Sequence, residues 1–301
     1  MRTIVVNGLS GWLGKSTIEV LRGFNPNEFQ VIGIGSHDRE IKLGNELFSI
    51  IKMENFRKTS DIAIYFDFAF KTREVEEELG RDKYIGVNRE LIEKSKKFIL
   101  TNIPSCVVLA SSGAIYEALE NESPEKQGVN PYSVLKLLQE EEIGFSANKT
   151  KANFIQTRIF NISGKNINKP NLFAMSNLMT QAIMEKRITI QSPGQITRRY
   201  CLAEELMELI FSLAEQQKSV KFDSGGEKIE IRALAKKIAT LFSELIPIQE
   251  SNTATEQKNS DYFSKSYEYE ELIEANLGRK PLSIDNQLAL TLKGVKELLI
   301  K

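Results

Sequence analysis

The chain has few of the residues that build metal centres and disulfide scaffolds. Among its 301 residues are 2 cysteines, Cys106 and Cys201, and 1 histidine, His37. Two cysteines form neither a disulfide framework nor a zinc site with three or four cysteine ligands. One histidine excludes a histidine-rich metal site, and a serine-hydrolase triad would depend on that single residue. We therefore expect a reduced protein without a metal site.

An excess of one charge and long apolar runs are also missing. Lys+Arg and Asp+Glu both number 40, so the formal net charge is zero, whereas a dedicated nucleic-acid binder usually carries a basic excess. No stretch approaches the ~18 apolar residues of a membrane span, and the first apolar run is too short for a signal peptide. The sequence thus predicts a soluble, cytoplasmic protein that binds neither nucleic acid nor membrane.

Short apolar runs alternate with longer helix-like stretches in the first half of the chain. Strands that alternate with helices of about ten or more residues indicate βαβ units and a parallel sheet. The composition changes near residue 161, where an asparagine-rich loop begins. The runs expected to form strands are Thr3–Val6, Phe29–Ile34, Asp61–Phe66, Ser105–Ala110 and Phe154–Phe160.

The predicted fold class is α/β: a Rossmann-type doubly wound parallel sheet with a smaller C-terminal substrate-binding lobe. We place the nucleotide-binding domain in residues 1–160 and the lobe in residues 161–301, and we expect the chain to return to the first domain near 196–213. A polar surface loop is expected over 250–265. Helices are expected at Tyr84–Leu100, Leu172–Arg187, Glu204–Leu213, Ile231–Leu245 and Leu282–Leu299.

A glycine-rich segment directly follows the first predicted strand and opens a predicted helix. It reads Gly8-Leu9-Ser10-Gly11-Trp12-Leu13-Gly14, a G-x-x-G-x-x-G pattern. Glycines permit a tight turn and bring the backbone close to a pyrophosphate, while the helix N-terminus supplies free N–H groups and a positive dipole end. A plain strand-to-helix turn is the alternative. The residues interpreted as cofactor-binding are Gly8, Gly11, Trp12, Leu13 and Gly14.

The end of the second predicted strand is expected to select the cofactor. An acid placed there would bind the adenosine ribose hydroxyls and favour NAD. No acid stands directly at the strand end, and Ser36, His37 and Arg39 are candidates to surround a 2′-phosphate. Asp38 could still reach a ribose hydroxyl, and for His37 and Arg39 an exposed loop is the alternative. The segment therefore favours NADP(H) within an NAD(P) site.

Tyr132 and Lys136 form a Tyr-x-x-x-Lys pair that shares one helix face. A lysine ammonium favours the phenolate of a neighbouring tyrosine, which makes Tyr132 a candidate acid/base at neutral pH. Ser112 follows the fourth predicted strand, at the carboxyl edge where parallel sheets bind ligands. It is a candidate to hydrogen-bond a substrate carbonyl or alkoxide, so the candidate catalytic residues are Ser112, Tyr132 and Lys136. A surface pair is the alternative for Tyr132 and Lys136.

Taken in order, these motifs resemble the extended short-chain dehydrogenase/reductase family, in its NAD-dependent epimerase/dehydratase branch. Segment 109–116 is similar to the family's Ser-Ser-x-x-Val-Tyr-Gly element, and segment 158–164 to its Arg-x-x-Asn-x-x-Gly element. Segment 198–206 is similar to Arg-Asp-Phe/Tyr-x-x-Val-x-Asp-Leu, and segment 277–281 to the closing Leu-Gly-x-x-Pro turn. Segment 65–69 departs from the family, which has His-Leu-Ala-Ala there.

The resemblance implies roles for individual residues. Tyr132 would be the acid/base on a sugar hydroxyl, Lys136 would hold the nicotinamide ribose, and Ser112 would bind the 4-oxygen. Asn161 and Arg198 match the positions that bind the diphosphate of a nucleotide-sugar, and the planar guanidinium suits phosphate oxygens. Glu205 stands at the family's usual aspartate, in a structural role, and relatives commonly form homodimers.

The implied activity is that of a nucleotide-sugar epimerase or 4-ketoreductase of carbohydrate biosynthesis, which transfers hydride at C4 of the sugar. The family's 4,6-dehydratases carry two carboxyls after the fourth strand, where this chain has Gly113 and Ala114, so a 4,6-dehydratase is not expected. Two other classes stay open: a non-catalytic NAD(P)-binding regulator, and a reductase of a small carbonyl compound that is not a nucleotide.

Overall fold

The chain folds into two compact units, residues 1–159 with 207–222 and residues 160–206 with 223–301. Helix α7 (Ala203–Glu215) begins in the second unit and ends in the first, so the chain crosses between units within this helix. The structure, a computed structural model, describes residues 2–25, 28–58, 60–119, 128, 130–191, 194–251 and 260–300. Within that part of the chain, no helix is long and apolar enough to cross a membrane.

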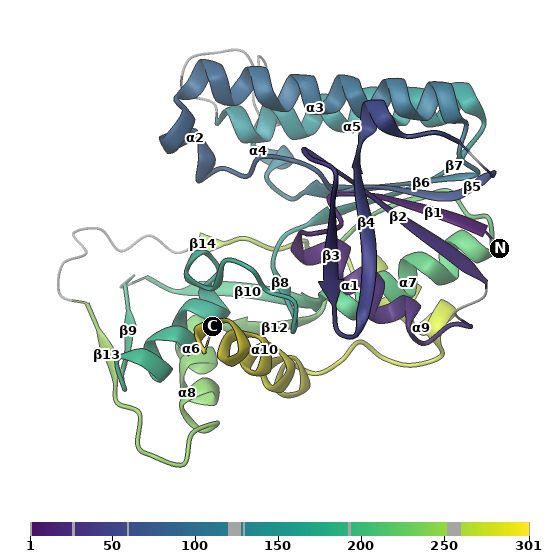
Figure 1. The fold of residues 1–301 in the computed structure, drawn as a ribbon. Coiled ribbons are helices and arrows are strands. Elements are labelled where there is room, and N and C mark those ends of the chain that lie inside the picture. Colours follow the sequence, from purple (N-terminus) through teal and green to yellow (C-terminus); the bar gives the residue numbers. More distant parts are fainter. Residues whose placement is uncertain are drawn as a thin grey trace. The chain divides into compact units, whose positions relative to one another are not determined.

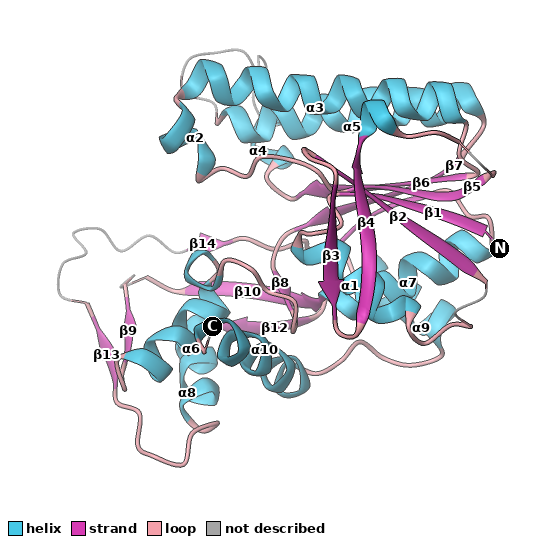
Figure 2. Cartoon of the chain, in the orientation of Figure 1, coloured by secondary structure: helices cyan, strands magenta, loops and turns pink. Residues whose placement is uncertain are grey.

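An eight-stranded sheet forms the centre of the first unit (Figures 1 and 2), in the order β11-β7-β6-β5-β1-β2-β4-β3. Strands β1, β2, β4, β5, β6 and β7 pair in parallel, and β3 pairs antiparallel with β4. This mostly parallel sheet confirms the predicted Rossmann-type α/β fold. The strands are β1 (Arg2–Asn7), β2 (Phe29–Gly35), β3 (Arg39–Leu43), β4 (Glu46–Lys52), β5 (Ile62–Asp67), β6 (Cys106–Ser112), β7 (Asn153–Ile159) and β11 (Val220–Asp223).

Apolar side chains on both faces of this sheet bury it between helices. Successive residues of a strand point to opposite faces, so neighbours in β5 serve two cores. Tyr65 stacks on Phe98 with ring centroids 4.7 Å apart, and Phe66 packs against Phe211 of α7 at 5.5 Å. Helices α3 and α5 lie side by side over the Tyr65 face (Figure 1). The helices are α1 (Trp12–Leu21), α2 (Val75–Leu79), α3 (Arg81–Asn102), α4 (Ile115–Leu119) and α5 (Pro131–Thr150).

The hairpin of β3 and β4 was not among the predicted strands. Its first strand alternates charged and apolar residues and is mostly exposed, so it lacks the continuous apolar run that marks a buried parallel strand. Gly44, with φ +63°, forms the turn between the two strands.

The second unit is built around strand β10 (Ile196–Leu202). This strand pairs antiparallel with β12 (Glu227–Glu230) and parallel with β8 (Ile162–Ser163) and β14 (Ser260–Asp261). Strand β14 lies in the segment 250–265 predicted to be a surface loop, so that prediction was wrong at residues 260–261, and positions 252–259 of it lie outside the described residues. A separate pair is formed by β9 (Ile188–Ile190) and β13 (Ile248–Glu250).

Helices α6 (Ala174–Met184), α8 (Ile231–Ala239) and α10 (Ile284–Leu299) of the second unit lie at predicted places but are shorter than predicted, whereas α9 (Glu268–Leu277) was not predicted. Helix α6 is shorter than 172–187, and α8 ends six residues before 245. Thr240 is the C-cap of α8, and its hydroxyl donates to the Lys237 carbonyl at 2.8 Å, a local bond of the kind that competes with helical backbone hydrogen bonds. Helices α9 and α10 complete the unit.

Glu205 ties these helices together. Its side chain, 1% exposed, accepts hydrogen bonds from the Tyr269 hydroxyl at 3.1 Å and from the Leu282 amide at 2.8 Å, and it pairs with Arg279. A buried carboxylate that is met by several donors stabilises the fold, in line with the structural role that the sequence indicated for Glu205.

We expect Glu205→Gln to lower the free energy of unfolding by about 1–3 kcal/mol, because the amide replaces one acceptor oxygen with a second set of donors. Chemical denaturation monitored by circular dichroism measures the change. Glu274→Gln, at an exposed position of α9, is the matched control and should cost less than about 0.5 kcal/mol. Equal stability of the two variants would contradict this assignment.

Candidate functional site

The strand order reverses at β1. The chain passes from β1 to β2 on one side and returns through β5 on the other, and ligands of such sheets bind at the carboxyl edge where this reversal occurs. Two loops meet there. Gly8 follows β1, and a Cβ atom on Gly8 would lie 3.1 Å from the Ala69 amide nitrogen, in the loop after β5. The glycine motif therefore lies at the switch point of the sheet.

The loop needs glycine at its two ends. Gly8 has φ +97°, a conformation that side chains disfavour, and a Cβ on Gly14 would come within 2.5 Å of the Leu9 carbonyl oxygen. Gly11 is the N-cap of α1, and no side chain in the described part of the chain caps the helix. Trp12 and Leu13 are its first two helical residues, so the first amides of α1 follow a tight, glycine-lined turn. This arrangement fits an anionic phosphate group.

Asp38, the acid that follows β2, is engaged in hydrogen bonds within the protein. The Asp38 carboxylate accepts from the Lys52 amide at 2.5 Å and from the Asn55 side chain at 2.7 Å, and these hydrogen bonds hold the Asp38 pKa below its ordinary value. Arg39 instead donates to the Ser10 hydroxyl, at 3.2 Å, within the glycine-rich segment. Of the predicted residues after β2, Arg39 therefore lies on the glycine-rich loop.

Ser36 and His37 contact each other. The Ser36 hydroxyl and the His37 Nδ1 are 2.8 Å apart, and both side chains are exposed. No contact of either residue with the glycine-rich segment is found among the described residues, in contrast to Arg39.

Ser112 is the last residue of β6, at the same carboxyl edge as the glycine motif. Its hydroxyl accepts from the Ala114 amide at 3.2 Å, which orients the side chain in the turn that follows the strand. Neighbouring Ser111 donates instead to the buried Glu140 carboxylate at 2.6 Å. The Ser111 hydroxyl thus binds a buried acid, whereas the Ser112 hydroxyl lies in the turn after the strand.

Tyr132 and Lys136 both lie on α5, with Phe70 against each of them. The Tyr132 ring meets the Phe70 ring edge to face, at 5.8 Å and 82°, and the Lys136 ammonium lies 4.0 Å from the centre of the same ring. Lys136 is buried and donates to the Ala110 carbonyl and to the Gln139 side chain, both at 2.9 Å. Burial lowers the Lys136 pKa to about 8.

Phe70 was not singled out in the sequence. The departure from the family at segment 65–69 stops one residue before it, and an aromatic residue after a strand is too common to stand out. Only the contacts with Tyr132 and Lys136 show that Phe70 belongs to the candidate site.

Asn161 and Arg198, in the second unit, line one cavity of about 250 Å³ together with Tyr200, Tyr262 and residues 172–174. An adjoining cavity of about 280 Å³ shares Arg198 and residues 172–174. Phe173 is the N-cap of α6, and none of the described side chains caps that helix. A half-buried cation and the N-terminus of a helix therefore line the same space.

Arg198 and Asn161 both donate hydrogen bonds to backbone carbonyls of the second unit. Arg198 donates to the carbonyls of Thr197 and Ser260, at 2.8 and 2.9 Å, and burial lowers its pKa. Asn161 donates to the carbonyls of Arg199 and Tyr262, at 3.3 and 2.8 Å. Both amide protons of Asn161 are thus used within the protein.

Tyr200 is a candidate residue that the sequence did not single out. It lines the cavity of Asn161 and Arg198, is 2% exposed, and its buried hydroxyl has no side-chain hydrogen-bond partner among the described residues. Residues 198 and 200 lie two apart on β10, so both point to one face of the sheet. That alternation is the signal from which the sequence would have shown it.

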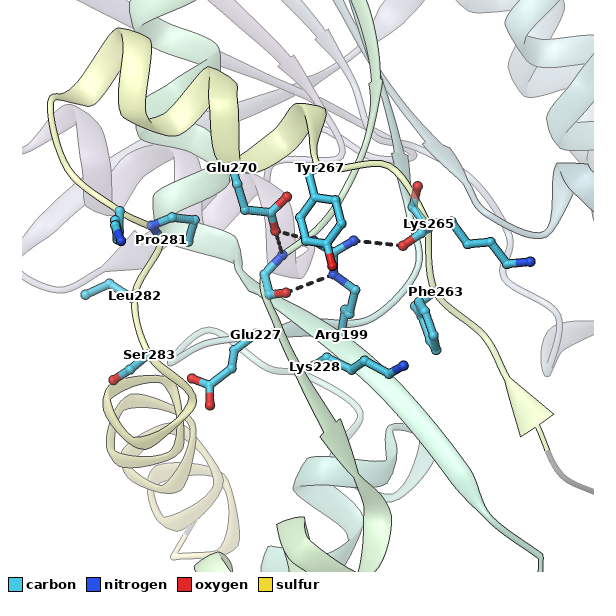
Figure 3. Close-up of a pocket in the computed structure, with 13 residues that line it drawn as sticks. Arg199, Glu227, Lys228, Phe263, Lys265, Tyr267, Glu270, Pro281, Leu282 and Ser283 are labelled. Atoms are coloured by element: carbon cyan, nitrogen blue, oxygen red, sulfur yellow. Dashed lines mark hydrogen bonds and ion pairs between the residues drawn. The ribbon is translucent and has the colours of Figure 1, made fainter.

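Arg199, between them, points to the other face and lines a cavity of about 640 Å³ (Figure 3). Its guanidinium donates to the carbonyls of Gly226, Ser264 and Ser266 and pairs with Glu270 at 2.5 Å. The Tyr267 ring lies over it, 4.7 Å from the guanidinium carbon. Arg199 therefore holds this part of the unit together.

Comparisons with solved structures show the same fold. Over 99% of both chains, the structure is similar to UDP-N-acetylglucosamine 4-epimerase from Methanobrevibacter ruminantium, in complex with UDP-N-acetylmuramic acid, with a TM-score of 0.75 and 18% identity. UDP-glucuronic acid 4-epimerase from Bacillus cereus, in complex with UDP-glucuronic acid and NAD, has a TM-score of 0.72 and 16% identity, over 99% of this chain and 100% of that chain.

A dehydratase is also among the similar structures. TunA, an NAD-dependent NDP-hexosamine 5,6-dehydratase, has a TM-score of 0.75 and 14% identity over 98% of both chains. A comparison with curated proteins finds no match. The family model described as the NAD dependent epimerase/dehydratase family matches residues 4–225, and the chain therefore belongs to this family.

Proposed function

We propose that the protein is an NAD(P)-dependent nucleotide-sugar epimerase or 4-ketoreductase that acts at C4 of the sugar. The observation that carries this proposal is that the glycine motif and Ser112 lie on one edge of the parallel sheet, beside the Tyr132–Lys136 pair of α5. A nucleotide site and an acid/base pair on one edge are what hydride transfer to a sugar carbon requires.

The cofactor site proposed for the first unit consists of the glycine motif, the uncapped N-terminus of α1, and Lys136. A nicotinamide dinucleotide bound there supplies the hydride acceptor or donor. The pairing of Asp38 with Lys52 and Asn55 supports NADP(H), because that acid is engaged elsewhere and the part of the chain that the structure describes shows no acidic partner of Arg39. Ser36 and His37 remain proposed neighbours of the 2′-phosphate.

In the second unit, the cavity of Asn161 and Arg198 supports a nucleotide-sugar as substrate. A diphosphate needs cations and amide donors, and Arg198 and the first amides of α6 are at hand. Asn161 would contribute its side-chain oxygen to a ligand hydroxyl, since its amide protons are used. The Tyr200 hydroxyl is a further donor for the same ligand.

The proposed acid/base is Tyr132, which exchanges a proton with the sugar hydroxyl. Ser112 would hydrogen-bond the same oxygen and hold it in place. Lys136, charged below its pKa of about 8, would favour the tyrosinate and hold the nicotinamide ribose. Together these three residues would move one proton and hold the reacting oxygen and the nicotinamide ribose in place.

Gly113 and Ala114 support C4 redox chemistry over loss of water, because neither carries a carboxyl group for the elimination. Dehydration stays an outcome of the test, since TunA is a 5,6-dehydratase of the same fold. The decisive experiment incubates the protein with UDP-, dTDP-, GDP- and CDP-sugars and NAD(P)(H), with products followed by NMR and the cofactor at 340 nm.

A retained cofactor with no net change in absorbance, together with a C4 epimer, identifies an epimerase. Consumption of one NADPH per sugar identifies a reductase. Product that lacks the elements of water contradicts both, and tight cofactor binding without turnover of any sugar favours the regulator or a small-carbonyl reductase.

We expect Tyr132→Phe to lower kcat by about 100-fold or more while the cofactor Kd changes little, because only the acid/base group is removed. Steady-state kinetics and calorimetric titration of the cofactor measure both quantities. Tyr267→Phe, at a mostly exposed tyrosine of the second unit, is the control and should keep full activity. Full activity of Tyr132→Phe would show that another group carries the proton.

Arg39→Ala should raise the Kd of NADPH by about tenfold and leave the Kd of NADH nearly unchanged. The reason is that the guanidinium would bind the 2′-phosphate, which NADPH carries and NADH lacks. Fluorescence titration with both cofactors checks this selectivity. Arg57→Ala, whose guanidinium donates to nearby carbonyls of Glu54 and Phe56, is the matched control. An equal loss for both cofactors would argue against a 2′-phosphate site.

Arg198→Ala should weaken binding of the nucleoside diphosphate by about 10- to 100-fold, the range for a lost charged hydrogen bond. Titration of UDP into the cofactor-loaded protein measures it, and the exposed Arg187→Ala is the control. Unchanged affinity would place the diphosphate elsewhere.

A further inference from the structure

Lys136 is surrounded on three sides within the first unit. Its ammonium donates to the Ala110 carbonyl oxygen and to the Gln139 side-chain oxygen, each at 2.9 Å, and lies 4.0 Å from the centre of the Phe70 ring. An ammonium has three protons, and two of them are donated to these oxygens. With 5% of the residue exposed, these contacts rather than water decide its charge and orientation.

Gln139 connects Lys136 to a buried acid. While its oxygen accepts from the ammonium, its amide nitrogen donates to the Asp67 Oδ2 at 3.0 Å. The opposite orientation of the amide would set its NH₂ group against the ammonium and its oxygen against the carboxylate. The two charged partners therefore fix the orientation of Gln139, and Gln139 relays the position of Asp67 to Lys136.

Asp67 is held as firmly on its other oxygen. The Oδ1 atom accepts from the Asn7 side chain at 2.9 Å and from the Ser95 hydroxyl at 2.8 Å, and the residue is 1% exposed. Burial raises the pKa of Asp67, and the hydrogen bonds from Ser95, Asn7 and Gln139 oppose that rise.

The other acid near Lys136 is Glu140, and its oxygens already accept hydrogen bonds from other residues. Glu140, on α5, receives two hydrogen bonds from Arg158, at 2.9 and 2.8 Å, and one from Ser111. Tyr132, on the same helix, meets the Phe70 ring edge to face. Asp67 of β5 is therefore the acid that hydrogen bonds join to Lys136.

We propose that Asp67 is a positioning residue, which through Gln139 holds the Lys136 ammonium charged and oriented. The proposal rests on the proposed function, in which Lys136 serves Tyr132 and the cofactor. Burial alone favours a neutral lysine, and the buried carboxylate counteracts this. Without the Asp67 carboxylate, Lys136 would lose its proton at a lower pH. A neutral amine would then bind the Gln139 oxygen less firmly.

Two substitutions separate the charge from the shape. In Asp67→Asn, the side chain keeps its shape and its oxygen can still accept from Gln139, but the negative charge is lost. In the double variant Asp67→Asn/Gln139→Glu, the charge moves to position 139, where one carboxylate oxygen accepts from Lys136 and the other from the amide at 67. Only the double variant restores an acid beside Lys136.

Carbon-13 NMR of labelled lysines in the cofactor-free protein measures the titration of Lys136, whose signal is identified by its loss in Lys136→Met. We expect a midpoint near 8 in the wild type, as burial dictates. Asp67→Asn should lower the midpoint by about one pH unit or more, and the double variant should restore it. Ser146→Ala, a buried serine of α5 outside this network, should leave it unchanged.

In turnover, the loss of activity at high pH should move down with the Lys136 midpoint in Asp67→Asn and return in the double variant. An unchanged midpoint in a folded Asp67→Asn protein overturns the proposal. If that variant does not fold, Gln139→Met tests the same link, and an unchanged midpoint there overturns it as well. If the midpoints shift as expected but the wild type turns over no nucleotide-sugar, the proposed function is what fails.

Discussion

A carboxylate removed from water must be met by donors, and in the first unit that requirement falls on Asp67. The donors come from three elements: Asn7 at the end of β1, Ser95 on α3, and Gln139 on α5. Each helix that covers this face of the sheet is thereby pinned to the strand end beside the glycine motif. Because Asn7 directly precedes Gly8, the same bond that satisfies Asp67 also fixes where the loop begins.

Much of this architecture could be predicted from the sequence. Continuous apolar runs such as the one in β6 mark strands buried on both faces, and the glycine motif and the Tyr132–Lys136 spacing are local patterns. Such local patterns do not predict which side chains pair when they are distant in the sequence. Gln139 and Asp67 are 72 residues apart, and no spacing rule connects them. The engagement of Asp38 by β4 is equally invisible before the hairpin is known.

In the second unit, two adjacent arginines illustrate the same limit. The pleat sends Arg198 and Arg199 to opposite faces of β10, so that one lines the cavity of Asn161 and the other is absorbed by carbonyls and Glu270. The motif alone predicted a role for the first. Period-two alternation would also have paired Arg198 with Tyr200, whereas the partners of Arg199 lie up to 71 residues away and depend on the fold.

The hairpin has a consequence for how the protein behaves at high concentration. Strand β3 ends the eight-stranded sheet, and an unpaired strand edge is a template on which another chain can add a strand. Three of its five residues, Arg39, Glu40 and Lys42, are charged and exposed or nearly so. Burying them against a second strand would cost desolvation of each charge. The hairpin thus closes the sheet with a charged border that discourages edge-to-edge aggregation.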